Sequence, residues 1–166
     1  MRIPLSLAPA CLLAVLVTAL IVPPPAAHAG SPRMDGLERS VVRKINRHRA
    51  AAGLRPMRVS APLARAADFH TREMLVGNYF AHSSRNGGSF ATRIHRFVRA
   101  RAVGETLAWL SRCGRHASHQ IVSMWMHSPP HRAILMSRSL HRVGIARRTG
   151  GLGRGRACVV TGDFAR

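Results

Sequence analysis

The segment of residues 125–135 constrains the fold more than any other, because two consecutive prolines divide it. Residues 118–126 carry apolar side chains at helical spacing, which predicts a helix with one buried face. Proline disrupts a helix that it enters, so Pro129 and Pro130 are expected to end this helix in a stiff bend. The bend would hold His131 in a fixed direction. A histidine held in this way is either a buried, hydrogen-bonded side chain or one part of a site.

The first 29 residues are typical of a secretory signal peptide. Arg2 precedes an apolar run over residues 5–22, and Ala27-His28-Ala29 provides the small residues of a cleavage site. The run approaches the length of a membrane span, so a retained anchor is the alternative. The cleavage sequence favours removal after Ala29 and therefore a secreted protein.

The chain carries 26 Lys and Arg residues against 6 Asp and Glu residues, which gives a formal net charge of +20. This charge predicts attraction to anionic cell-envelope polymers or lipids. The basic residues are scattered along every segment, and neither zinc-finger spacing nor an RNA-binding aromatic motif accompanies them. We therefore do not expect sequence-specific nucleic-acid binding.

Two cysteines, Cys113 and Cys158, follow the expected signal peptide. An even pair in an exported chain predicts a disulfide bond. Two free, buried thiols are the alternative. The spacing of the pair matches no metal-binding motif.

Hydrophobic periodicity and turn residues predict helices in the first half of the chain and strands at its end. The expected helices are residues 38–52, 61–77 and 90–98, with an extended segment at residues 102–110 and a short helical turn at residues 133–136. Two further strands, residues 140–146 and 156–164, are expected to be joined by a glycine-rich hairpin loop over residues 147–155. Helices combined with a small antiparallel sheet indicate the α+β class.

Four short motifs stand in a fixed order along the chain. They are Asn46-x-x-Arg49-x-x-x-Gly53-Leu54, Tyr79-Phe80-Ala81-His82, Gly104-Glu105-Thr106 and the segment of residues 125–135. Together they resemble the CAP superfamily of cysteine-rich secretory, antigen 5 and pathogenesis-related-1 proteins, in its bacterial SCP-like branch. The resemblance implies a three-layer α-β-α sandwich. With the expected signal peptide over residues 1–29 and a short lead over residues 30–36, the resemblance places residues 37–166 in one CAP domain.

The resemblance also implies a cleft. Family members carry two histidines and two glutamates there, and His82, Glu105 and His131 match three of the four, while Ser128 aligns with the remaining glutamate. Two neutral imidazoles and a carboxylate can bind zinc or another divalent cation and leave a position open for water. They can also transfer protons without a metal. The alternative is a hydrogen-bond network that only fixes the floor of the cleft.

Four other residues have structural interpretations. His70 lies on the apolar face of its helix and is expected to be a core histidine. Tyr79 and Phe80 are expected to fill the core and so orient His82. Asp163 is interpreted as an anchor near the N-terminal helix.

These observations predict an exported, monomeric CAP-domain protein that binds and does not catalyse. Its His/Glu cleft would take a small ligand, a lipid or a divalent cation, and its basic surface would hold anionic envelope polymers. One alternative is a metal- or His/Glu-dependent hydrolase. Ser83 beside His82 suggests a nucleophile and its base, but neighbours in the sequence do not easily form the hydrogen bond that this pair needs. The other is a cationic antimicrobial protein.

Overall fold

The structure is a computed structural model that describes residues 34–166. The expected signal peptide, residues 1–29, lies outside the described residues. Helices and strands are mixed along the chain, which ends in two consecutive strands. The helices are α1 (Gly36–Ala51), α2 (Ala61–Gly77), α3 (Phe90–His95), α4 (Ala117–His127) and α5 (Pro129–Leu135), and the strands are β1 (Arg58–Val59), β2 (Val103–Leu110), β3 (Arg142–Leu152) and β4 (Gly155–Ala165). Within residues 34–166, no helix has both the length and the apolar character needed to span a membrane.

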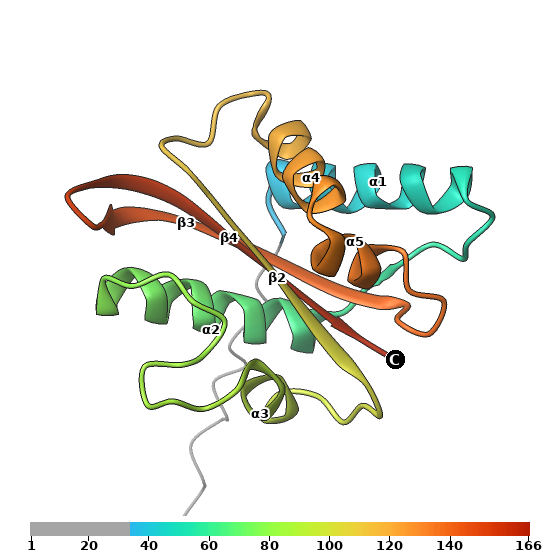
Figure 1. Ribbon diagram of the computed structural model, residues 1–166, viewed down its shortest axis with the longest axis horizontal. Helices are drawn as coiled ribbons and strands as arrows, with labels where there is room; N and C mark the ends of the chain where they lie inside the picture. The colour runs from blue at the N-terminus through green and yellow to red at the C-terminus, as the bar shows by residue number, and fades with distance from the viewer. Residues whose placement is uncertain (1–33) are drawn as a thin grey trace, which may run out of the picture.

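The elements form three layers, as the family resemblance implied. The sheet has the order β1-β3-β4-β2, in which β1 runs parallel to β3 and the other pairs are antiparallel. Helices α1, α4 and α5 cover one face of this sheet, and α2 and α3 cover the other (Figure 1). The predicted α-β-α sandwich is therefore confirmed.

The expected hairpin loop over residues 147–155 is wrong. Strands β3 and β4 stay paired as far as Leu152 and Gly155, so the turn itself contains only Gly153 and Arg154. Gly153 has a φ of 61°, which glycine adopts at little cost. A two-residue turn is sufficient to join antiparallel strands, and the other glycines of this stretch are extended strand residues.

The two prolines of the central segment begin a helix and do not form a bend. α4 ends at His127 as expected, but Pro129 and Pro130 occupy the first positions of α5. An N–H group at that position has no partner within a helix, so proline is tolerated there. His131 consequently lies in the first turn of α5.

The main core lies between the sheet and the layer that contains α1 and α4. Val41, Ile45 and Ile121 are fully buried there beside Trp125. The indole Nε1–H of Trp125 donates to the carbonyl oxygen of Leu107 at 2.9 Å, which ties α4 to β2.

The prediction that Phe80 fills the core is wrong, because its side chain is 39% exposed. Tyr79 is half-buried and packs against a smaller cluster around Met74. Residue 80 lies in the loop between α2 and α3, and its side chain is not among those packed against the clusters of buried residues.

Two close connections fix the layers. On one face, α2 lies directly against β3 at Gly144, where an added Cβ would come within 2.0 Å of the backbone nitrogen of Ala64. On the other side of the molecule, Cys113 and Cys158 form the predicted disulfide, with their Cα atoms 5.6 Å apart. This bond joins the segment before α4 to β4.

Candidate functional site

The three predicted cleft residues come from three different elements and meet in space. His82 follows α2, Glu105 lies in β2, and His131 lies in α5. Nδ1 of His82 is 2.8 Å from Oε1 of Glu105, and the rings of His82 and His131 have their centroids 5.7 Å apart. The structure thus brings the three residues together.

Glu105 is the fixed centre of this cluster. Its side chain is fully buried, and its second oxygen forms an ion pair with Arg93 of α3. A buried carboxylate is stable only when its oxygens are bonded, and the two partners satisfy this need. Because a carboxylate accepts hydrogen bonds, His82 donates through Nδ1–H and leaves Nε2 as the nitrogen without a proton in the neutral ring.

Arg93 was missed by the sequence analysis, although it holds the site together. It is 2% exposed, and besides Glu105 it donates to the carbonyl oxygen of His82 at 3.2 Å and to Oγ of Ser84 at 3.0 Å. One guanidinium thus fixes both the acid and the backbone of the histidine. The available signal was an arginine on the apolar face of a short helix that also carries Phe90 and Ile94.

Asp163 also belongs to this site, so its interpretation as an anchor near the N-terminal helix is wrong. It faces Glu105 directly in the register of β2 and β4 and is fully buried. Neither of its carboxyl oxygens has a hydrogen-bond partner in residues 34–166. Burial, and then the charge of Glu105, raise the pKa of Asp163 well above its usual value, whereas Arg93 acts in the opposite direction. Asp163 is therefore held in its neutral form beside the carboxyl group of Glu105.

The two histidines differ in exposure. The side chain of His82 is 47% exposed, whereas His131 is half-buried. Burial, and then the neighbouring His82, lower the pKa of His131, and Glu105 opposes this effect. A lowered pKa keeps the imidazole of His131 neutral at pH 7, with a nitrogen lone pair available.

The residues that could hold a metal ion differ from the three predicted ligands. The described residues contain no group of three or more His, Cys, Asp and Glu side chains arranged to hold a metal ion. Both oxygens of Glu105 are already bonded, so the residues that fit a cation are the imidazoles of His82 and His131. Ser128 lies at the junction of α4 and α5, and its side chain does not cap α5.

His70 is a core histidine, as predicted. Its side chain is fully buried, with Nδ1 3.0 Å from Oε2 of Glu73 and Nε2 2.8 Å from the carbonyl oxygen of Ala81. Because Ala81 precedes His82, this second bond fixes the chain where it enters the site.

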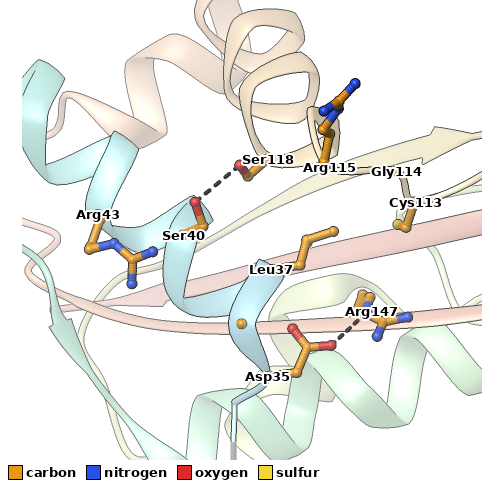
Figure 2. A pocket seen from close by; sticks show the side chains of 10 residues that line it. Asp35, Leu37, Ser40, Arg43, Cys113, Gly114, Arg115, Ser118 and Arg147 are labelled. Carbon is orange, nitrogen blue, oxygen red and sulfur yellow. Dashed lines mark hydrogen bonds and ion pairs between the residues drawn. The ribbon is translucent and has the colours of Figure 1, made fainter.

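A separate cavity of about 440 Å³ lies at the start of α1 (Figure 2). Asp35 pairs with Arg147 across it at 2.5 Å, and the hydroxyls of Ser40 and Ser118 are 3.1 Å apart. Arg43 and Arg115 also line this cavity, and Arg115 points away from the ion pair in Figure 2. None of the three cleft residues lines this cavity.

The family described as "CAP: Cysteine-rich secretory protein family" matches residues 42–164. The uncharacterized protein YkwD of Bacillus subtilis is 28% identical over 113 residues, which are 68% of this chain and 42% of that protein.

Two solved structures have the same fold. An extracellular protein with an SCP domain from Bacillus anthracis is 23% identical with a TM-score of 0.62, over 79% of this chain and 40% of that one. An outer surface protein of Borrelia burgdorferi is 18% identical with a TM-score of 0.64, over 78% of this chain and 93% of that one. The chain thus spans about two fifths of the length of the two Bacillus proteins.

Proposed function

The chain belongs to the cysteine-rich secretory protein family, and we propose that it is an exported binding protein whose paired histidines take a divalent cation, zinc in the first place. One observation carries this proposal: Glu105 holds Nδ1 of His82 at 2.8 Å while the ring of His131 lies 5.7 Å from that of His82. A carboxylate bonded to one ring nitrogen fixes the tautomer and directs the other nitrogen to a ligand.

Glu105 acts in this proposal as the orienting partner and not as a metal ligand. Arg93 and His82 occupy its two oxygens, so a cation would be held by Nε2 of His82 and an imidazole nitrogen of His131. Zinc accepts imidazole ligands, and water or a small anionic ligand would complete its coordination. The exposure of His82 supports access from solvent.

A binding role accounts for these contacts without a reaction. Hydrolysis would require a base that takes a proton from water. Glu105 is bonded through both oxygens to neighbouring side chains, and in this proposal the free nitrogens of His82 and His131 hold the cation. Asp163 is buried and has its pKa raised, which also makes it unsuited to that role at neutral pH.

We also place the protein outside the cytoplasm, with anionic envelope polymers or lipids as partners of its surface. The signal-like leader and the neighbours described as extracellular and outer-surface proteins support this location. The charge supports the partners, because the chain has 26 basic residues and its 6 acidic ones make internal contacts or are buried.

Calorimetric titration with zinc chloride tests the cation site. The wild type is expected to bind zinc saturably, and the His82→Ala/His131→Ala variant is expected to lose this binding. Glu105→Gln should weaken it by about 10–100-fold, because the outer partner no longer orients His82. The matched control is His116→Ala/His119→Ala, which removes two exposed histidines from the start of α4. Equal titrations for the wild type and the His82/His131 variant would refute the proposal.

A further inference from the structure

A cavity at the β1 end of the sheet is lined by three arginines together with a proline and a histidine. It has a volume of about 380 Å³, and its lining residues are Arg55, Pro56, Arg58, Arg138 and His141. The chain around β1 contributes the first three, and the segment between α5 and β3 contributes the other two. No acidic side chain lines it. Like charges gathered around one hollow repel each other, and a bound anion would offset that repulsion.

Arg49 of α1 holds the two walls of this cavity together. Its Nε donates to the carbonyl oxygen of Arg55 at 2.8 Å, on one wall. Its Nη1 donates to the carbonyl oxygens of Leu135 at 2.6 Å and Ser137 at 2.9 Å, at the base of the other wall. Nη2 is 3.4 Å from the carbonyl oxygen of Leu140. The buried side chain of Arg49 therefore holds both walls of the cavity in place before any ligand binds.

Arg49 is also a buried charge that is paired with carbonyl oxygens and with no carboxylate. It is 1% exposed, and burial lowers the pKa of its guanidinium. All six acidic residues of the chain lie in the described part, and none of them bonds Arg49 or lines the cavity. They are Asp35, Glu38, Asp68, Glu73, Glu105 and Asp163. A buried cation without a counter-charge is costly, so an anion in the adjoining cavity would stabilise it.

His141 is fixed at the edge of the cavity. Its Nδ1–H donates to the carbonyl oxygen of Ser139 at 3.0 Å, which leaves Nε2 for another partner. Its own carbonyl oxygen accepts from the backbone N–H of Arg58 at 2.8 Å, so the two walls also meet through the backbone.

We propose that this cavity binds the phosphate group of an organic phosphate, with Arg55, Arg58 and Arg138 as donors. Guanidinium groups present paired N–H donors that match phosphate oxygens. The cavity is larger than a bare phosphate ion, so it leaves room for part of the esterified group. The inference rests on the proposed function in so far as that function gives the basic surface anionic partners. The inference adds that the phosphate groups of these partners bind in this cavity.

Titration with glycerol phosphate tests the site, followed by calorimetry and by the side-chain nitrogen signals of His141. The Arg58→Gln/Arg138→Gln variant is expected to bind at least tenfold more weakly than the wild type. The matched control is Arg101→Gln/Arg112→Gln, which removes the same charge from two exposed positions outside the cavity. The control should bind as the wild type does. Neither variant should melt below the phosphate-free wild type, and the loss of two repelling charges should slightly raise the melting temperature of the cavity variant.

Two results would overturn the inference. Equal weakening in both variants would mean that net charge alone attracts the phosphate, which would leave the basic surface of the proposed function in place. No saturable binding by the wild type would also remove the site, whereas the zinc titration would be unaffected. Competition between glycerol phosphate and phosphatidylglycerol vesicles, with phosphatidylcholine vesicles as the blank, then identifies a free phosphate or a lipid head group as the source.

Discussion

Replacing Gly144 by alanine should destabilise the protein more than any other change of one methyl group in β3. Gly144 lies where α2 approaches the sheet, and a Cβ there would be 2.0 Å from the backbone nitrogen of Ala64 and 2.2 Å from the carbonyl carbon of Leu63. These are main-chain atoms, so rotation of a side chain cannot relieve the contact. The helix itself would have to move.

The size of this effect follows from the distances. An ordinary contact of a Cβ lies at 3.4–4 Å, so α2 would have to withdraw from β3 by more than 1 Å along this direction. The side chains of Leu63, Ala66 and Ala67 on α2 are fully buried and would lose contacts as the helix moved. Overpacking a core costs about 1–3 kcal/mol, and occasionally more when the backbone must shift. We expect at least about 3 kcal/mol, a large part of the roughly 5–15 kcal/mol that stabilises a typical domain.

Urea unfolding followed by circular dichroism measures this loss, with Gly151→Ala as the matched control. Gly151 lies in the same strand, and nothing is within 4 Å of an added Cβ there. The control should be neutral or slightly stabilising, because alanine restricts the unfolded chain. A Gly144→Ala variant within about 1 kcal/mol of the wild type would refute the packing argument. The same variant should also weaken zinc binding, because α2 carries His70, which fixes the chain next to His82.

Two further predictions concern stability. Replacing Cys113 and Cys158 by serine should lower the free energy of unfolding by about 4 kcal/mol, because the bond closes a loop with a sequence separation of 45 residues. Unfolding with and without reductant measures this, and a wild type that is insensitive to reductant would contradict it. Asp163 should make the free energy of unfolding fall as pH rises. Because its pKa is raised in the folded state, the stability that its neutral carboxyl group contributes is complete below about pH 3.9 and is lost as pH rises through the folded-state pKa. Asp163→Asn should remove that part of the decline, and parallel stability curves from pH 4 to 9 would show that Asp163 does not titrate in this way.

The sequence predicted those elements whose ends are marked by neighbouring residues. The helix at residues 61–77 has its observed bounds because Pro62 marks its first turn and Asn78 ends it in a left-handed conformation with a φ of 52°. The N-terminal helix begins at Gly36 and not at Glu38, because Asp35 and Glu38 form a capping box. That spacing of acid and glutamate is itself a readable start signal.

The errors concern features that depend on distant parts of the chain. Glycines such as Gly150 and Gly151 are ambiguous alone, and only pairing with β4 makes them strand residues. Similarly, His82, Glu105 and His131 were found through motifs, whereas Arg93 and Asp163 lie outside these motifs. They join the site because α3 packs on β2 and because Asp163 pairs opposite Glu105.

Because the acidic residues are engaged in internal contacts or buried, the charge of the protein surface depends little on alkaline pH. Lys44 is the one lysine, so the outward charge comes almost wholly from guanidinium groups, which stay protonated far above physiological pH. Acidification of the surroundings therefore adds positive charge at histidines and then neutralises carboxylates, whereas alkaline conditions remove almost no charge. The attraction of this surface to anions should therefore depend on ionic strength and hardly at all on alkaline pH. A lysine-rich surface of equal charge would lose its attraction at the pH where its ammonium groups lose their protons.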